Sequence, residues 1–503
     1  MPLINSIIYW FNVKRLHQIE LFKKYPGNVQ REVFMKLIRQ AEETEWGKKY
    51  HYKDIESIKQ FQARVPIQTY EDIVPYVDRQ RSGEQNILWP SDIKWYAKSS
   101  GTTSEKSKFI PVSPEALEEC HFRGAKDVMA LYTNQFPDSL VLRGKSLTLG
   151  GSHQINNYST QSYYGDLSAI LIENMPFWSN FIRTPSAEVA LIPDFEEKVE
   201  KITKIAIKEN VTNIAGVPSW NLVLLKYILD ATGNDNLLDV WPNLELFTHG
   251  GVSFTPYREQ FKKIIPSPQM NYLETYNASE GFFGIQDDLN DSSMLLMLDY
   301  GVFYEFLPLH KLSDSNPPIY AIDEVEKGVN YAIIISTNGG LWRYMIGDTI
   351  VFTSLTPHKF KITGRTKYFI NAFGEEIILE NAENALMTAC KHTGAQISDY
   401  TAGPIYMSDD AKGAHEWLIE FEKEPDDLER FTDVLDKTLC SINSDYEAKR
   451  YKNSTLVTPT VVSIPRGTFY QWFQSKGKVG GQHKMPRLAN DRKYLDEIHQ
   501  LIS

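Results

Sequence analysis

The chain has 503 residues, which at about 100–200 residues per domain is enough for two to four domains, or for one large domain with a smaller companion. Hydrophobic residues make up 42% and charged residues 23%, the balance of a globular protein, which excludes wholesale disorder, collagen and a coiled coil. The net charge is −11, so no basic field would gather phosphates, and a general nucleic-acid binder is excluded. Three widely spaced cysteines exclude a disulfide framework and predict a reducing cytoplasm.

The first 22 residues carry apolar side chains at helical spacing, among them Leu3, Ile7 and Phe11. They lack a cationic start and a small-residue cleavage site, so they do not read as a signal peptide. No apolar run approaches the roughly 20 residues needed to cross a bilayer. We therefore expect a helix packed on the body rather than a membrane-surface anchor, in a cytoplasmic monomer with no membrane partner.

Helical periodicity and capping signals predict four further helices. Ser113-Pro114-Glu115 offers a Ser N-cap, a Pro at the first helical position and an acid in the first turn. Pro193-Asp194 opens a second helix in a similar way. The four predicted helices are residues 27–46, one that starts near 113, one that starts near 193, and a long one over 426–450.

Strand-like runs alternate with these helices, which predicts an α/β or α+β class. The β-rich runs are residues 294–309, 331–337 and 417–422. The best boundary is the cationic segment 357–372, which follows a long β-rich block. It divides the chain into a large domain, residues 1–365, and a cap, residues 366–503.

The first chemical motif is a run of small hydroxylic residues, 99–109 (SSGTTSEKSKF). Its hydroxyls and the N–H groups of a flexible turn can fold around phosphate oxygens, and Lys108 adds positive charge. The spacing is not that of a Walker A motif. A phosphate-binding loop and an ordinary solvated Ser/Thr turn both fit this pattern.

The second motif, residues 272–284 (YLETYNASEGFFG), sets a carboxylate among hydroxyl groups in an aromatic context. Glu280 could hold Mg²⁺ through one or two direct bonds while the ion keeps its waters. The alternative is a turn whose aromatic residues belong to the core.

The third motif, residues 341–349 (LWRYMIGDT), follows the apolar run YAIIIST and a Gly-Gly turn. We expect Asp348 at the end of a strand, where active-site groups of open sheets often lie. A carboxylate there could accept both hydroxyls of a ribose. A hairpin turn with a surface Asp is the alternative.

Two further motifs lie in the C-terminal third. Residues 364–367 (GRTK) precede an acidic stretch, and residues 480–487 (GGQHKMPR) place Lys484 in a glycine-rich loop. A lysine in such a loop on a separate cap could reach a distant site, whereas a lone lysine is more often a solvated side chain. Other chemistries lack their motifs: the sequence has no HExxH, no GxSxG elbow and no GxGxxG after a strand.

The five motifs, in this order and spacing, resemble the adenylate-forming superfamily of acyl-CoA ligases, luciferases and peptide-synthetase adenylation domains. The chain is more similar still to the auxin-responsive acyl acid amido synthetase family of plants and its bacterial relatives. Residues 216–220, 250–253 and 443–450 also look like that family. The resemblance covers about residues 5–500. It implies a large N-terminal domain of β-sheets flanked by helices, with a small mobile α+β cap.

Two departures from the family pattern stand out. The superfamily's phosphate loop usually has a second glycine where Ser104 or Glu105 stands. Plant members generally carry Arg where Met345 stands, so the plant substrates do not transfer directly to this chain.

The resemblance implies a two-step reaction. ATP, with Mg²⁺, converts a small carboxylic acid into an acyl-adenylate, and an amine such as an amino acid then takes the acyl group. Lys484 would bridge the acid and the α-phosphate, the cap would turn near Lys367, and Glu280 would position Mg²⁺. The implied nucleotide-binding residues are Ser99, Ser100, Gly101, Thr102, Thr103, Lys108, Gly250, Gly251, Tyr276, Asn277, Ala278, Ser279, Glu280, Asp348 and Arg365. Candidates for the acyl-acid pocket are Arg123, which could also be a surface helix charge, and Trp220.

Two other functions remain open. An acyl-CoA ligase would share the adenylation machinery and differ only in its thiol acceptor; the family-like block 443–450 favours the amide product. A nucleotide-binding protein without turnover is the second, and the joint presence of Lys484, Glu280 and Asp348 argues against it.

Overall fold

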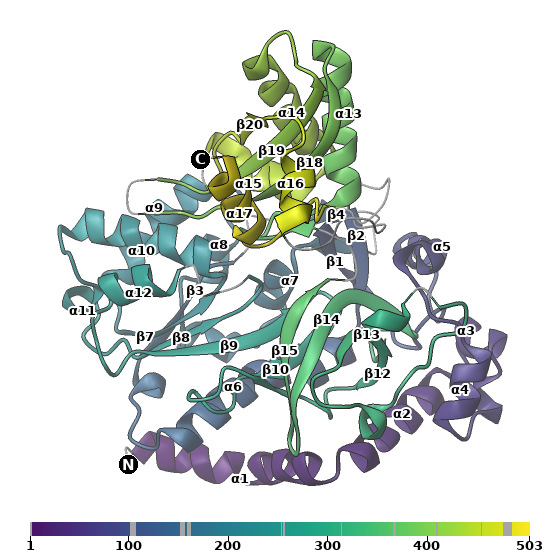
Figure 1. Ribbon diagram of the computed structural model, residues 1–503. Helices are drawn as coiled ribbons and strands as arrows, with labels where there is room; N and C mark the ends of the chain where they lie inside the picture. The colour runs from purple at the N-terminus through teal and green to yellow at the C-terminus, as the bar shows by residue number, and fades with distance from the viewer. Residues whose placement is uncertain are drawn as a thin grey trace.

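The computed structural model describes residues 3–100, 107–150, 156–157, 162–252, 254, 257–312, 314–365, 369–408, 411–453, 455–475 and 485–502. A large α/β body carries a smaller α+β part built from the C-terminal residues, which stands above the body in Figure 1. The predicted α/β class is confirmed. None of the helices in these ranges is long and apolar enough to cross a membrane.

The body is organised around a sheet that contains eleven strands within the described residues, in the order β12-β13-β14-β15-β11-β10-β9-β8-β7-β3-β6. One half is parallel, so its strands share one carboxyl edge. Those strands are β3 (Lys145–Thr148), β6 (Arg183–Thr184), β7 (Val211–Gly216), β8 (Leu246–His249) and β9 (Asn271–Ala278). The antiparallel half contains β10 (Gly281–Ile285), β11 (Met294–Leu296), β12 (Val302–Pro308), β13 (Asn330–Thr337), β14 (Tyr344–Leu355) and β15 (His358–Arg365).

Helices cover the parallel half. The helix predicted to start near Pro193 begins where expected, because the Asp194 side chain accepts a hydrogen bond from the backbone N–H of Glu197 (2.9 Å), as an N-cap does. The helices here are α7 (Leu167–Glu173), α8 (Ala187–Ala190), α9 (Phe195–Ala206), α10 (Pro218–Thr232), α11 (Leu237–Val240) and α12 (Arg258–Ile264).

N-terminal helices run beneath the antiparallel half (Figure 1). Ile19 and Phe22 of the first helix are buried, which confirms that this part of it packs on the body; the side chains of residues 3–11 lie outside the described ones. The helix predicted over 27–46 is divided in two, because Thr44 caps a new start. The helices are α1 (Leu3–Lys24), α2 (Pro26–Ala41), α3 (Glu45–Lys49), α4 (Ile58–Arg64), α5 (Tyr70–Arg81) and α6 (Phe122–Gln135), the last preceded by a π-helical segment, Ala116–His121, behind Ser113.

A second, smaller sheet lies beside the C-terminal part. Its order is β2-β1-β5-β4, with β1 (Trp95–Ser100), β2 (Ser107–Val112), β4 (Asn156–Asn157) and β5 (Tyr163–Gly165). The hairpin of β1 and β2 pairs Ser100 with Ser107 and Ser99 with Lys108. Both ends of the hydroxylic motif are therefore held in one antiparallel ladder.

The C-terminal part packs two long helices against a sheet of order β18-β19-β20. The single helix predicted over 426–450 is wrong: it breaks at Asn443, whose side chain accepts hydrogen bonds from the backbone N–H groups of Asp445 and Tyr446 and so caps a new helix. The elements are β16 (Phe369–Ile370), β17 (Ile377–Ile378), α13 (Leu379–Thr393), β18 (Gln396–Ile405), β19 (Ala414–Lys423), α14 (Leu428–Ile442), α15 (Ser444–Arg450), β20 (Thr460–Ile464), α16 (Thr468–Ser475) and α17 (Lys493–Ile502).

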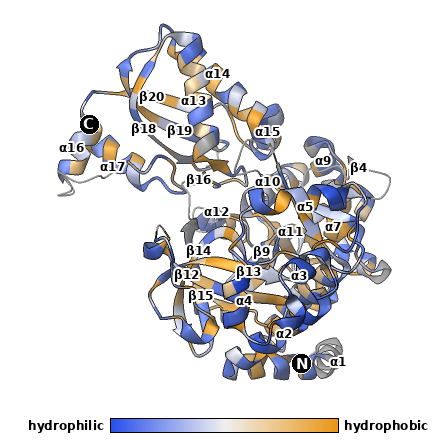
Figure 2. Ribbon diagram, turned by 90° about the vertical axis from the view of Figure 1, so that its right-hand side faces the viewer, coloured by the Kyte–Doolittle hydropathy of each residue, from blue (hydrophilic) through white to orange (hydrophobic). Residues whose placement is uncertain are grey.

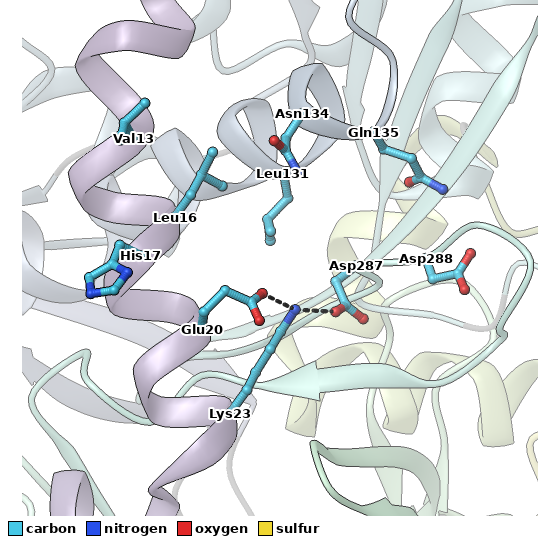
Figure 3. Close-up of a pocket in the computed structure, with 10 residues that line it drawn as sticks. All are labelled: Val13, Leu16, His17, Glu20, Lys23, Leu131, Asn134, Gln135, Asp287 and Asp288. Carbon is cyan, nitrogen blue, oxygen red and sulfur yellow. Dashed lines mark hydrogen bonds and ion pairs between the residues drawn. The ribbon is translucent and has the colours of Figure 1, made fainter.

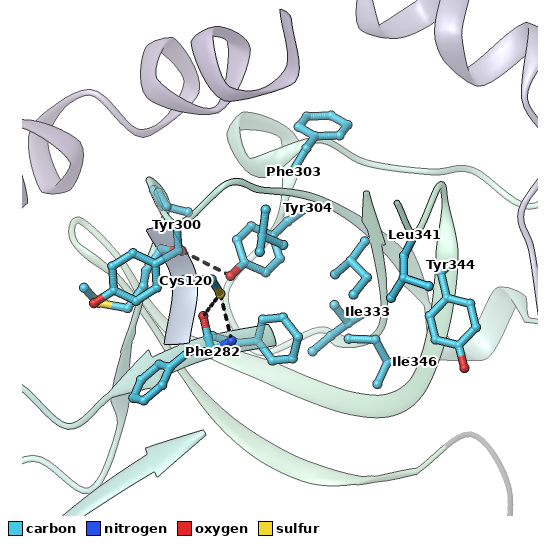
Figure 4. Close-up of a cluster of buried hydrophobic side chains, with 14 of the residues drawn as sticks. Cys120, Phe282, Tyr300, Phe303, Tyr304, Ile333, Leu341, Tyr344 and Ile346 are labelled. Atoms are coloured by element: carbon cyan, nitrogen blue, oxygen red, sulfur yellow. Dashed lines mark hydrogen bonds between the residues drawn. The ribbon is translucent and has the colours of Figure 1, made fainter. Parts of the chain in front are cut away.

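Two apolar cores hold these layers together. The first lies between the N-terminal helices and the antiparallel strands, whose hydrophobic colour is visible in Figure 2. Figure 4 shows part of it, where Cys120 exchanges hydrogen bonds with the backbone of Phe282; burial raises the pKa of that thiol to about 12. The second core continues from Ile214 and Trp241 of the body to Trp417 of the C-terminal part, so apolar contact joins the two.

Candidate active site

Two glycines follow β8 at the carboxyl edge of the parallel strands. A Cβ atom on Gly250 would lie 2.4 Å from the carbonyl oxygen of Thr275 on β9, and Gly251 has φ +82°. Position 250 therefore requires glycine, and position 251 favours glycine because of its positive φ. This close approach sets the end of β8 directly against β9, the strand that carries the second motif.

Replacing Gly250 with alanine is expected to destabilise the protein by about 1–3 kcal/mol, the usual cost of forcing atoms into a filled space. The clash is with backbone, which cannot move aside as a flexible side chain can. Urea unfolding measures the change. Gly328→Ala is the matched control: its Cβ would meet nothing within 4 Å, and its φ of +83° leaves only a backbone cost of about 1–2 kcal/mol. Equal midpoints for Gly250→Ala and the unmodified protein would contradict this packing.

The turn between β9 and β10 brings the second and third motifs together. The Tyr276 hydroxyl donates a hydrogen bond to the carboxylate of Asp348, and both side chains are buried. Asp348 was expected at the end of a strand; it lies within β14, paired with Arg365 of β15. The expected position was wrong, because β14 (Tyr344–Leu355) begins before Asp348 and continues past it.

Asn277 is held by a histidine from the π-helical segment. Nδ1 of His121 donates to Oδ1 of Asn277 across 3.0 Å. Burial lowers the pKa of His121 to about 4, so the ring is neutral at physiological pH. His121 therefore orients Asn277 without adding charge, and the sequence analysis did not identify it.

Glu280 occupies the β9–β10 turn, where protein surrounds it but solvent still reaches the side chain. Burial raises the pKa of Glu280 to about 7, partly offset by the positive charge of Lys108, while Asp348 and Glu376 raise it further. These four groups therefore lie within electrostatic reach of one another. The structure thus brings together residues from four separate motifs. Lys108 comes from the hydroxylic motif, and Glu280 and Asp348 come from the two carboxylate motifs. Glu376 comes from the acidic stretch after residue 364.

Lys108 is 8% exposed, and its ammonium lies 5.9 Å from the centre of the Tyr70 ring. It is a buried cation directed into this region from β2. Ser99 is its strand partner on β1, and Ser100 closes the ladder. The remaining members of the predicted phosphate loop, Gly101, Thr102 and Thr103, lie outside the described residues.

The two candidates for the acyl-acid pocket lie in different places. Nη1 of Arg123 donates to the backbone carbonyl of Asp299 (3.1 Å), next to an ion-pair network of Arg15 and Asp127. Trp220 lies at the base of the C-terminal part, where its indole N–H donates to the carbonyl of Phe373 (3.3 Å). The pocket assignment of both residues stays a prediction.

Lys484 and Lys367 lie outside the described residues, as does the side chain of Arg365. Their assigned roles therefore remain predictions. Among the residues that the structure does describe, no group of three His, Cys, Asp or Glu side chains is arranged to hold a metal ion.

A separate cavity of about 560 Å³ lies between α1 and α6. Figure 3 shows Lys23 between Glu20 and Asp287, with N–O distances of 3.0 and 3.1 Å. The Lys23–Asp287 pair ties α1 to the segment after β10. None of the predicted site residues lines this cavity.

Family models match most of the chain. The GH3 family N-terminal domain matches residues 15–270, the central domain residues 295–365, and the C-terminal domain residues 380–493. The chain belongs to the GH3 family. The family resemblance predicted from the sequence motifs is thereby confirmed.

Curated relatives of this GH3 chain include three plant proteins. Indole-3-acetic acid-amido synthetase GH3.3 of Arabidopsis thaliana is 23% identical and covers 95% of this chain and 92% of the relative. 4-substituted benzoates-glutamate ligase GH3.12 of the same plant is 24% identical, covering 88% and 89%. Jasmonoyl–L-amino acid synthetase JAR4 of Nicotiana attenuata is 24% identical, covering 94% and 92%.

Solved structures share the fold. GH3.15 acyl acid amido synthetase superposes with a TM-score of 0.61 at 17% identity, over 97% of this chain and 95% of that one. A 2-hydroxyisobutyryl-CoA ligase in the thioesterification state gives a TM-score of 0.59 at 12% identity, over 95% and 92%. The predicted adenylate-forming architecture is confirmed.

Met345 has a structural setting that accommodates its departure from the plant pattern. It packs on a small apolar cluster of Leu307, Ala332 and Ile334. The methionine is therefore part of the apolar packing of β14.

Proposed function

We propose that this GH3 protein is an ATP-dependent acyl acid amido synthetase, which adenylates a carboxylic acid and transfers the acyl group to an amine such as an amino acid. The observation that carries the proposal is the convergence of Tyr276, Asp348, Glu280 and Lys108 at the carboxyl edge of the parallel strands. Family membership and the named activities of the plant relatives support it.

In the first half-reaction, the acid's carboxylate oxygen attacks the α-phosphorus of ATP, and the bond to pyrophosphate breaks. Asp348, oriented by the Tyr276 hydroxyl, accepts the ribose hydroxyls. Negative charge builds on phosphate oxygens in the transition state, so preorganised cations and N–H donors lower the barrier most. Lys108, Lys484 and the hydroxylic loop supply them.

A single carboxylate that solvent can reach suits Mg²⁺, because that ion usually keeps several waters and takes phosphate oxygens as further ligands. Glu280 is such a group. When bound, Mg²⁺ neutralises charge on the triphosphate. Glu280, beside Lys108, orients the reacting phosphates from the β9–β10 turn.

In the second half-reaction, the amine nitrogen attacks the acyl carbon. The C–N bond forms, the C–O bond to AMP breaks, and AMP leaves with the electron pair. An amine that arrives as an ammonium ion gives up one proton before the attack and one after it. Residues from the C-terminal part cover the site during this step and keep water from the adenylate.

The protein acts as a cytoplasmic monomer on small molecules. Its three cysteines, all in the described part of the chain, form no disulfide there, which supports a reducing compartment.

Lys367→Pro is expected to separate the two half-reactions. The segment between β15 and β16 joins the body to residues 366–503, the proposed cap. If the cap turns after adenylation, a few dihedrals there must change, and proline would fix φ near −65°. Pyrophosphate exchange should then persist while amide formation falls at least about tenfold.

Lys367→Ala is the matched control, since it removes the charge without restricting the backbone. If the alanine variant loses amide formation equally, the lysine charge rather than the hinge matters. If both half-reactions fall together with the melting temperature in Lys367→Pro, the segment is a rigid turn inside one domain.

A further inference from the structure

The π-helical segment Ala116–His121 lies against the β9–β10 turn of the candidate active site. At its end the backbone N–H of Phe122 donates to the carbonyl oxygen of Leu117, five positions earlier instead of the four of an α-helix. Segments of this kind occur frequently at functional sites. The last two side chains of the segment, those of Cys120 and His121, are both buried and have no role in the half-reactions above.

These two adjacent side chains hold two residues that face each other across β9 and β10. Nδ1 of His121 donates to Oδ1 of Asn277 on β9 (3.0 Å). Sγ of Cys120 accepts from the backbone N–H of Phe282 on β10 (3.1 Å) and donates to its carbonyl oxygen (3.8 Å; Figure 4). Asn277 and Phe282 are partners in the antiparallel ladder. We call these four residues the π clamp, because one short segment holds both strands at the same pair.

The π clamp lies at the base of the turn that presents Glu280. One further residue pair closes the ladder beyond it, and Ser279 and Glu280 then form the turn. On the other side of the clamp the register of the two strands shifts between Phe282 and Gly284. Pairing farther along the strands therefore does not set the register at the turn, because an irregularity of this kind disrupts the ladder locally. The clamp sets that register from outside the ladder.

The ring of Phe282 is held as firmly as its backbone. A Cβ atom on Gly124, in the first turn of α6, would lie 2.6 Å from that ring, so the ring packs directly on the helix backbone. A Cβ atom on Gly281 would lie 2.8 Å from the Phe283 ring and 3.6 Å from Sγ of Cys120. The start of β10 is therefore closely packed against both the π-helical segment and α6.

The π clamp carries no charge at physiological pH. Burial lowers the pKa of His121 to about 4 and raises the pKa of the Cys120 thiol to about 12. An ionised group at the base of the turn would act on Glu280, whose pKa the charge of Asp348 already raises. The clamp therefore holds the turn in place and leaves the charge balance of the site unchanged.

We propose that Cys120 and His121 are positioning residues for adenylation, which hold the Asn277–Phe282 pair and thereby aim Glu280 at the phosphates of ATP. This inference rests on the proposed function. Polar groups that satisfy one another in a buried network hold a single arrangement, and a turn released from them does not. A misplacement of about 1 Å can cost about 100-fold in rate, so the clamp controls adenylation without touching the reacting atoms.

The test removes one arm of the clamp and then restores it. In His121→Leu, kcat/KM for ATP in pyrophosphate exchange is expected to fall at least about tenfold, because the turn is released. The affinity for ATP, measured by calorimetry without acid, should fall at least about fivefold, the scale of one buried hydrogen bond. His121→Asn places an amide N–H near the position of Nδ1 and should keep both values close to those of the unmodified protein. Cys120→Ala and Cys120→Ser form the corresponding pair for the other arm.

His358→Leu is the matched control. His358 is also buried, its Nε2 lies 3.1 Å from the carbonyl oxygen of Ile322, and it stands at the opposite end of β15 from Arg365. Its loss should lower the melting temperature and leave the ATP parameters unchanged. A double-mutant cycle separates positioning from folding: in an Asn277→Ala background, His121→Leu should change the ATP parameters less than about threefold, because its partner is already absent.

Equal losses of ATP affinity and exchange in His121→Leu and His358→Leu, or full additivity in the cycle, would overturn the proposal. If no acid supports exchange in the unmodified protein, the synthetase assignment falls, and a loss of ATP affinity that His121→Asn restores still supports the clamp. If exchange occurs and neither His121→Leu nor Cys120→Ala alters it, the clamp is wrong and the proposed function stands. Should His121→Leu fail to fold, the comparison of Cys120→Ala with Cys120→Ser decides.

Discussion

Replacing Lys484 with alanine is expected to lower acid-dependent pyrophosphate exchange by at least about 100-fold, the scale of removing one donor from a developing anion. By resemblance to the family, this lysine bridges the attacking acid and the α-phosphate. Such a contact forms fully only as charge develops, so kcat should fall and ATP binding should remain nearly intact. Exchange kinetics and nucleotide binding, measured on the same preparation, test both parts.

Lys478→Ala is the matched control, a lysine of the same C-terminal segment with no assigned role. It should retain exchange. Exchange in Lys484→Ala within threefold of the unmodified protein would remove Lys484 from the chemistry.

Asp348→Ala is expected to weaken ATP binding more than it slows the chemical step. A ribose contact is made equally in the ground and transition states, so its loss appears mainly in KM. A hydrogen bond to a charged group is worth about 1.5–3 kcal/mol, or about ten- to 150-fold. KM for ATP, with kcat measured alongside, reports the change.

Tyr276→Phe is the companion variant, because it keeps the ring and removes only the hydroxyl that orients Asp348. Its effect on KM should have the same direction and be smaller. An unchanged KM for ATP in Asp348→Ala, with an unchanged melting temperature, would place the ribose elsewhere.

Much of the fold followed from local signals in the sequence. Asp194 caps its helix as the Pro-Asp pair predicts, and the run Asn330–Thr337 is a buried strand as its β-branched residues predict. Family identity came from the order of short motifs, each weak alone.

The rest depended on contacts that no local pattern encodes. The break at Asn443 interrupts an apolar periodicity that continues through it, and only the capping hydrogen bonds reveal a second helix. His121 is 156 positions from Asn277, and the pair forms only when the sheet and the π-helical segment meet.

The most direct test of the account is ATP–pyrophosphate exchange across a library of carboxylic acids, followed by product analysis with amino acids and with coenzyme A as acceptors. We predict exchange that depends on a particular acid, and an amide as the product. A thioester formed in place of an amide would make the protein an acyl-CoA ligase. No exchange with any acid, together with retained ATP binding, would contradict the synthetase assignment and indicate a nucleotide-binding protein without turnover.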